Sequence, residues 1–192
     1  MFSASKLILL GLLSVSASLV GAIDIYLYDA QHSCSGAAFV CTNVNPNQCC
    51  GNDSNDHHSL AFRAKPREWN LEVRGHSNGN CRDLTLRGQS GTGSTDTCLT
   101  FSNPNSQPIG SFSGAGYSFW NRRRTTAEGL SNCHTESPTC GGLQRPDRLD
   151  LADGTKYNIT GLTDAERLEL RSAVTTKVTA AEIPTKFDHF KI

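Results

Sequence analysis

The chain has 192 residues, in which 18 lysines and arginines balance 18 aspartates and glutamates. A formal net charge of zero leaves no basic excess to displace the counterions of a phosphate backbone, so we expect no nucleic-acid partner. The 17 glycines and 7 prolines are too few and too irregularly spaced for a collagen-like or low-complexity chain. The length suits one domain.

The first 22 residues have the organisation of a secretory signal peptide. Lys6 supplies a single positive charge, residues 7–13 are apolar, and residues 20–22 have the small side chains that signal peptidase selects. A retained membrane anchor is the alternative, but the segment is short and becomes rich in serine toward its end. We therefore expect its removal, secretion to the extracellular space, and a single mature domain over residues 23–192. No later apolar run is long enough to cross a bilayer.

An even number of cysteines follows this segment. An even count in an exported chain predicts disulfides, here four, whose connectivity the sequence leaves open. Neighbouring cysteines are too close to bond each other easily, so Cys49 and Cys50 should send their bridges to different elements. The spacing contains no zinc knuckle, and we expect no metal and no cofactor. The eight are Cys34, Cys41, Cys49, Cys50, Cys81, Cys98, Cys133 and Cys140.

Short β-branched and aromatic segments, separated by turn-forming residues, predict a β-dominated fold. Strands are expected at residues 23–28, 37–41, 60–63, 69–74, 84–86 and 112–120. Polar loops are expected at residues 43–58, 88–97 and 121–142.

A β-hairpin is predicted over residues 147–159, where Asp153 and Gly154 form a strong turn signal. A two-residue loop would place apolar residues opposite charged ones. A three-residue loop with Gly154 in the left-handed conformation instead pairs Leu149 with Tyr157 and separates an apolar face from a charged face. We therefore expect the three-residue loop.

A helix is expected after the hairpin, from Asp164 to about Thr176, with Thr163 and Glu166 in capping-box spacing. We expect Ala165, Leu168 and Ala173 to face inward. Residues 183–192 are expected to form a loose tail or a short edge strand. The fold class is thus α+β: a small, β-dominated, disulfide-rich domain with a C-terminal hairpin followed by one helix.

Two adjacent histidines, His57 and His58, lie in the first polar loop. An imidazole can perform general acid–base catalysis of the ribonuclease kind, but adjacent side chains point apart, so we interpret them as solvated turn residues and assign no catalytic residue. Two sequons, at Asn52 and Asn158, predict N-glycosylation.

The run from Asn55 to Ser59 resembles the calcium-binding core of βγ-crystallin domains, and the opening strand followed by Gly36 resembles the start of their Greek key. This resemblance implies oxygen ligands for calcium. Leu60, however, stands where that family has serine.

A run of three arginines in the last polar loop is the most conspicuous charge cluster. It is interpreted as a solvated loop, a dibasic processing site or a partner contact. The candidate partner-contact residues are Asn55, Asp56, His57, His58, Arg122, Arg123 and Arg124.

The signal-like segment, the eight cysteines and the arginine run together resemble the cysteine-rich small secreted proteins of filamentous fungi. The resemblance implies an effector with a role in virulence: a monomeric, non-enzymatic protein that binds an extracellular host or microbial protein or glycan to modulate defence. The alternatives are a secreted hydrolase of ribonuclease or wall-degrading type that uses His57 or His58, and a wall-associated structural glycoprotein.

Overall fold

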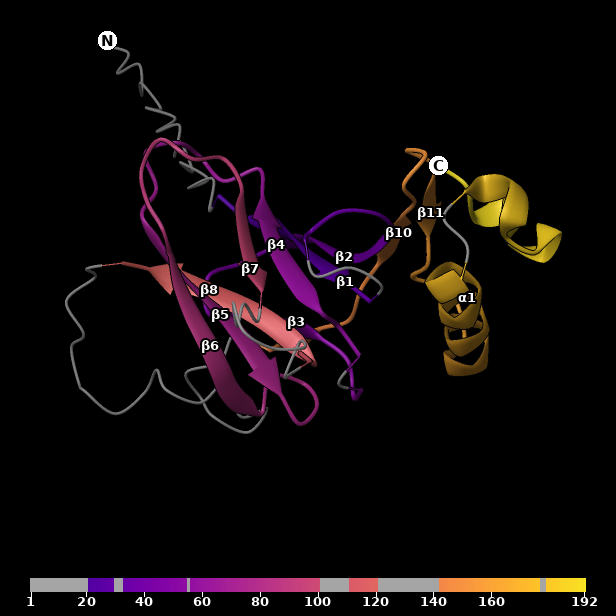
Figure 1. Ribbon diagram of the computed structural model, residues 1–192, viewed down its shortest axis with the longest axis horizontal. Coiled ribbons are helices and arrows are strands. Elements are labelled where there is room, and N and C mark those ends of the chain that lie inside the picture. The colour runs from indigo at the N-terminus through magenta and orange to yellow at the C-terminus, as the bar shows by residue number, and fades with distance from the viewer. Residues whose placement is uncertain (1–20, 30–32, 55, 101–110, 121–141, 177–178) are drawn as a thin grey trace, which may run out of the picture.

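In the computed structural model, two β-sheets pack against each other, and the C-terminal hairpin and helices lie at one end of them (Figure 1). The structure describes residues 21–29, 33–54, 56–100, 111–120, 142–176 and 179–192. The segment expected to be a signal peptide lies outside these residues except for its last two positions.

The first sheet has six strands in the order β11-β10-β2-β1-β4-β7. In chain order they are β1 (Ile23–Tyr28), β2 (Ala38–Val44), β4 (Ser59–Arg63), β7 (Thr97–Thr100), β10 (Arg148–Asp150) and β11 (Lys156–Asn158). The second sheet has five strands in the order β6-β5-β8-β3-β9. They are β3 (Cys49–Gly51), β5 (Leu71–Ser77), β6 (Asp83–Ser90), β8 (Gly114–Phe119) and β9 (Leu143–Gln144).

Alternation along β1 shows how the core forms between the sheets. Ile23, Ile25 and Leu27 are fully buried in the main hydrophobic cluster. The intervening residues face the other side because successive side chains of a strand point to opposite faces. Val73 on β5 and Tyr117 on β8 complete this cluster from the second sheet. The chain is therefore β-dominated, as expected.

Three disulfides join the two sheets and their loops: Cys34–Cys98, Cys41–Cys50 and Cys49–Cys81. The expectation that adjacent Cys49 and Cys50 bridge to different elements is confirmed, because one bonds Cys81 and the other bonds β2. The last two cysteines lie outside the described residues. Six oxidised cysteines are typical of a protein that folds in an oxidising compartment.

Two of the polar loops were predicted too long, and the third, at residues 121–142, lies outside the described residues except for its last position. β3 forms within residues 43–58 because β8 and β9 supply its hydrogen-bond partners, and no local alternation signals it. β6 likewise extends to Ser90, into the loop expected at residues 88–97, by pairing with β5.

The C-terminal hairpin adds β10 and β11 to the first sheet, where β10 also pairs with β2. Leu149 lies opposite Tyr157, and the Leu151 N–H donates to the Thr155 carbonyl at 2.8 Å. Gly154 has a φ of +87° in the turn. This is the register of a three-residue loop.

Helix α1 (Asp164–Thr176) begins with a capping box, in which the Thr163 N–H donates to Glu166 Oε2 at 2.8 Å and the Glu166 N–H donates to Thr163 Oγ1 at 3.3 Å. The expected inward face was wrong for Ala165 and Leu168, whereas Ala173 is half-buried and packs against the core as expected. Leu170 and Val174 are buried, whereas Ala165 is exposed and Leu168 is 66% exposed. Within the described part of the chain, no helix is long and apolar enough to cross a membrane.

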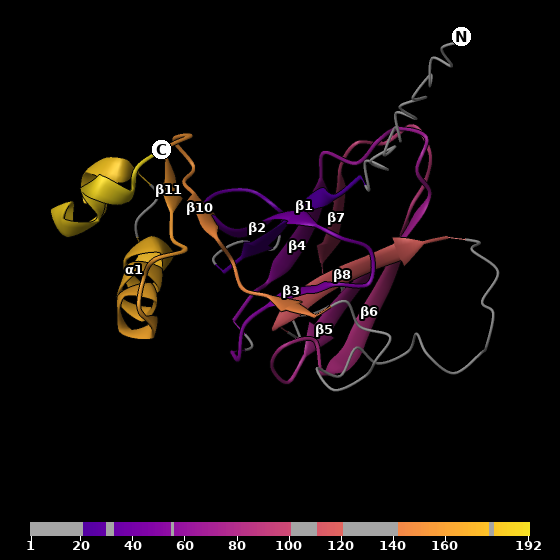
Figure 2. The same ribbon diagram turned by 180° about the vertical axis from the view of Figure 1, so that it is seen from behind.

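Residues 183–192 are not a loose tail. Two short 3-10 helices, η1 (Ala180–Glu182) and η2 (Thr185–Phe190), bring Ile183 and Phe187 into the core. The Ile192 N–H then donates to the Lys156 carbonyl at 3.0 Å. Figure 2 shows this C-terminal region from behind, beside the hairpin. Ile183 and Phe187, four residues apart, thus attach this segment to the core. Two apolar positions are too few to predict a packed segment from the sequence.

The close approach of β8 to β3 at Gly114 gives a test of the packing in the second sheet. A Cβ atom added at Gly114 would lie 2.7 Å from the Cys50 carbonyl oxygen and 2.8 Å from Cys81 Sγ. We expect Gly114→Ala to lower the free energy of unfolding by about 2 kcal/mol, because backbone and a disulfide would have to shift. Urea unfolding of the oxidised protein measures this. Gly161→Ala is the matched control, since nothing lies within 4 Å of its added Cβ; equal effects of the two substitutions would contradict the packing described.

Candidate functional site

A groove of about 460 Å³ lies between helix α1 and the loop that follows β3. Helix α1 contributes Leu168 and the arginines of its inner face to one wall, and residues 52–54 form the other. The Phe39 side chain from β2 and Pro146, just before β10, complete the lining. The groove is therefore built from segments that are far apart in the sequence.

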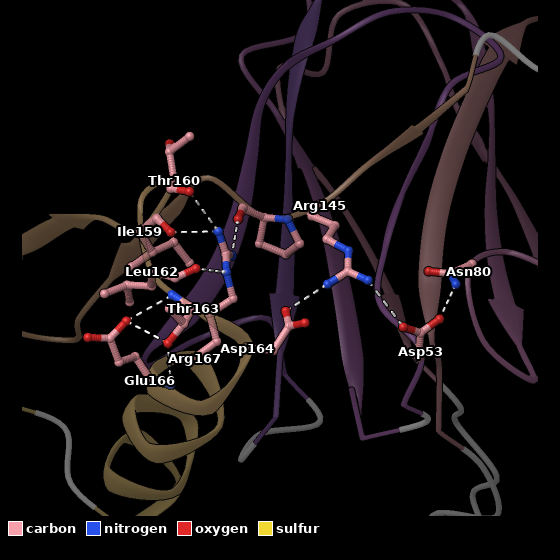
Figure 3. Close-up of polar contacts among 11 residues, drawn as sticks. Asp53, Asn80, Arg145, Ile159, Thr160, Leu162, Thr163, Asp164, Glu166 and Arg167 are labelled. Carbon is pink, nitrogen blue, oxygen red and sulfur yellow. Dashed lines mark hydrogen bonds and ion pairs between the residues drawn. The ribbon is translucent and has the colours of Figure 1, made fainter.

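An ion-pair bridge spans the rim of the groove (Figure 3). Arg145 donates from one nitrogen to Asp164 Oδ1 at 3.0 Å and from the other to Asp53 Oδ2 at 3.3 Å. All three side chains are largely exposed, so each pair contributes little to stability. Asn80 donates to Asp53 from the opposite side. The rim thus presents a guanidinium between two carboxylates.

Arg167 fixes the helix on the rest of the fold. Its guanidinium donates to the carbonyls of Pro146 at 2.8 Å, Ile159 at 2.6 Å and Leu162 at 3.2 Å (Figure 3). These carbonyls belong to the segments on either side of the hairpin. Arg167 therefore holds the start of α1 against the base of the hairpin.

Arg171, one turn farther along α1, forms the charged end of the groove. Its Nε donates to Asp29 Oδ2 at 2.6 Å, and one terminal nitrogen donates to Ser54 Oγ at 2.5 Å. The same nitrogen lies 3.0 Å from an Asp56 carboxylate oxygen. Its guanidinium carbon is 5.9 Å from the centre of the Phe39 ring.

His57 also belongs to this cluster, because it contacts Asp29. Its interpretation as a solvated turn residue was therefore wrong. Its ring is fully buried, and Nδ1 lies 2.5 Å from Asp29 Oδ1. Burial alone would raise the pKa of Asp29, but hydrogen bonds and positive charge from His57 and Arg171 together hold that pKa below its ordinary value. His57 thus helps to hold helix α1 on the end of β1.

The acid–base and calcium interpretations of this loop find no support in the geometry. His57 Nε2 is buried with no hydrogen-bond partner among the described residues, and His57 does not line the groove. Asp56 is paired with Arg171, and Ser59 Oγ is buried, where it accepts the Cys34 N–H at 3.0 Å. Residues 21–29, 33–54, 56–100, 111–120, 142–176 and 179–192 contain no group of three acidic, histidine or cysteine side chains placed to hold a metal ion.

Of the candidate contact residues, the structure describes Asp56, His57 and His58, and these three differ in exposure. His57 is buried and cannot contact a partner, His58 is half-buried, and Asp56 is exposed. Asn55 and the arginines at 122–124 lie outside the described residues.

The residues that line the groove form no sequence motif, but one pattern in the sequence could have predicted the inward side of α1. Arg167, Leu170, Arg171 and Val174 follow helical spacing, which places both arginines on the buried face.

The two sequons differ in exposure. Asn158 is exposed on β11, and its Oδ1 accepts the Thr160 N–H at 3.0 Å. Asn52 is half-buried on the rim of the groove, and its Oδ1 accepts both the N–H and the hydroxyl of Ser54.

The Asp29 cluster predicts a pH-dependent contribution to stability. Because the pKa of Asp29 is lowered in the folded protein, its stabilisation is complete above its ordinary pKa of 3.8 and is lost as the pH falls through the folded-state pKa. We expect Asp29→Asn to lower the free energy of unfolding by about 3 kcal/mol at pH 7, since Arg171 loses its buried partner. The difference from the wild type should shrink below pH 4.

Chemical unfolding at pH 7 and at pH 3 measures both quantities. Glu169→Gln is the control, because Glu169 lies on the same helix as Arg171 but forms an exposed ion pair, with Lys186 of η2. A deficit of the same size at both pH values would contradict a charged Asp29 in the cluster.

Comparison with known proteins identifies a family for this chain. No curated protein and no solved structure matches the chain. Residues 24–147 match the family described as the ARB_05566_N N-terminal domain. This range extends from β1 to the residue before β10, so it contains both sheets except the hairpin strands. Since the match covers more than half of its length, the chain belongs to the ARB_05566_N N-terminal domain family.

Proposed function

We propose that the chain is a secreted, effector-like binding protein that acts outside the producing cell on a host or competitor target to modulate its defence. The groove between α1 and residues 52–54 is its contact site. The observation that carries this proposal is the combination of an exposed leucine, Leu168, with a charged rim in one concave site.

The shape and lining of the groove support binding. Ligand sites are typically concave, roughly 300–1,000 Å³ in volume, and lined by apolar side chains with a few placed polar groups. Leu168, Pro146 and Phe39 supply the apolar part, and Arg145 with its two carboxylates supplies the polar part. A large exposed apolar side chain in such a site favours a covering partner.

Catalysis by His57 receives less support. The ring has no exposed surface and its Nδ1 is engaged by Asp29, so a substrate would have to displace core residues to reach it. General acid–base chemistry requires a titrating nitrogen within hydrogen-bond reach of the substrate. The secreted hydrolase that uses His57 is therefore the weaker alternative.

Secretion is supported by the signal-like residues 1–22 and by three disulfides. When the full chain is expressed in a eukaryotic secretory host, we expect the protein in the medium with Ile23 as its first residue. We also expect a mass that decreases on treatment with peptide N-glycosidase, and Asn158→Gln should remove one glycan. Intact-mass spectrometry measures both; retention in the cytosol with reduced cysteines would contradict secretion.

A paired substitution tests the groove. We expect Leu168→Arg to reduce binding of the labelled protein to intact host or competitor cells by more than tenfold, because a charged side chain would occupy the apolar wall. Ile192→Arg is the matched control, since Ile192 is equally apolar and 74% exposed but does not line the groove.

Binding is measured by flow cytometry on cells from several candidate hosts and competing microbes, with the thermal stability of each variant checked. Equal loss or equal retention in the two variants would contradict a role for the groove.

A further inference from the structure

We infer that the groove binds a short neutral oligosaccharide of an extracellular glycan, an inference that rests on the proposed function and names the ligand of the same site. It follows from the charge balance of the groove, the pairing of its rim groups and its apolar wall.

The charges around the groove nearly cancel. Three arginines and two aspartates line the groove, and two further aspartates next to it pair with Arg171. Arg145 likewise pairs with both aspartates of the lining. A strongly anionic ligand would meet the carboxylates, and a polycationic ligand would meet the arginines, so both are disfavoured. The groups concerned are Arg145, Arg167, Arg171, Asp29, Asp53, Asp56 and Asp164.

The rim suits neighbouring hydroxyl groups. A sugar hydroxyl both donates and accepts, so two adjacent hydroxyls can bond to a carboxylate and a guanidinium at the same time. Arg145 places its planar donors beside both Asp53 and Asp164, within 3.3 Å. Because these pairs are exposed, a ligand can insert between them at little cost.

The apolar wall suits the C–H face of a sugar ring. Leu168 is 66% exposed beside Pro146, and covering its side chain would remove apolar surface from water. A pyranose combines such a face with a ring of hydroxyls, so it can contact the wall and the rim together.

An extended peptide is disfavoured on this side of the groove. Peptides commonly bind by adding a strand to a free sheet edge. β10, the strand next to Pro146, is already paired on both sides, with β2 and with β11. The groove therefore contacts its ligand through side chains and not through hydrogen bonds between backbone strands.

The test is calorimetric titration of the full oxidised chain with four neutral tetrasaccharides: chitotetraose, laminaritetraose, cellotetraose and mannotetraose. We expect at least one to bind with a dissociation constant below about 1 mM, a moderate affinity for a small site. Arg145→Ala and Leu168→Ala should each weaken that binding by roughly tenfold, the effect of removing one polar or apolar contact.

Arg87→Ala is the matched control, because Arg87 is a half-exposed, ion-paired arginine on β6, away from the groove. Unchanged affinity in this variant is expected. The inference is overturned if none of the four sugars binds, if Arg145→Ala binds as the wild type does, or if an acidic peptide or a heparin fragment binds at this site instead.

Periodate treatment of the target cells separates this inference from the proposed function. Loss of cell binding after periodate oxidation of surface sugars supports an oligosaccharide ligand. If binding survives periodate but is still lost in Leu168→Arg, the groove binds a protein, so the proposed function stands and the oligosaccharide inference fails.

Discussion

The ion pair between Arg171 and Asp29 is the interaction on which the groove depends. Arg171 is on α1 and Asp29 follows the last residue of β1, so their 2.6 Å contact joins the C-terminal helix to the first strand of the fold. Both side chains are mostly buried, and a charge left unpaired there would be costly. His57 and Ser54 complete the cluster, and together they fix the loop that forms the opposite wall. This salt bridge and its neighbours thus connect the two walls of the groove.

The disulfides give this arrangement a rigid base. Cys41–Cys50 ties β2 of the first sheet to β3 of the second, and Cys49–Cys81 ties the same short strand to the turn before β6. The groove wall at residues 52–54 begins immediately after β3. Two covalent links therefore anchor the chain within a few residues of the rim. A site held in this way loses less conformational entropy when it binds a ligand.

The sequence predicted those elements whose pattern lies within a few consecutive residues, and it missed those that depend on contacts between distant residues. β1 and α1 have the bounds expected from strand alternation and from the Thr163 capping box, because those patterns lie within a few consecutive residues. β3 was missed because its partners lie far along the chain, in β8 and β9. Ala165 and Leu168 were wrongly assigned to the inner face of α1, because arginines are usually exposed and were not expected there. Tertiary contacts with Asp29 and with backbone carbonyls place the half-buried Arg167 and Arg171 on that face.

The matched domain ends at residue 147, and the groove is lined by residues from both sides of that boundary. Residues 24–147 belong to the matched domain and contribute Phe39, residues 52–54, Arg145 and Pro146, whereas Leu168 and Arg171 come from the segment after it. Membership of the family therefore accounts for the two sheets and for one wall of the groove. The other wall is supplied by a helix that is attached through the buried side chains Leu170 and Val174 and through the polar contacts of its two arginines. If the proposed contact site is correct, the side chains of α1 supply the part of its specificity that the matched domain does not contain.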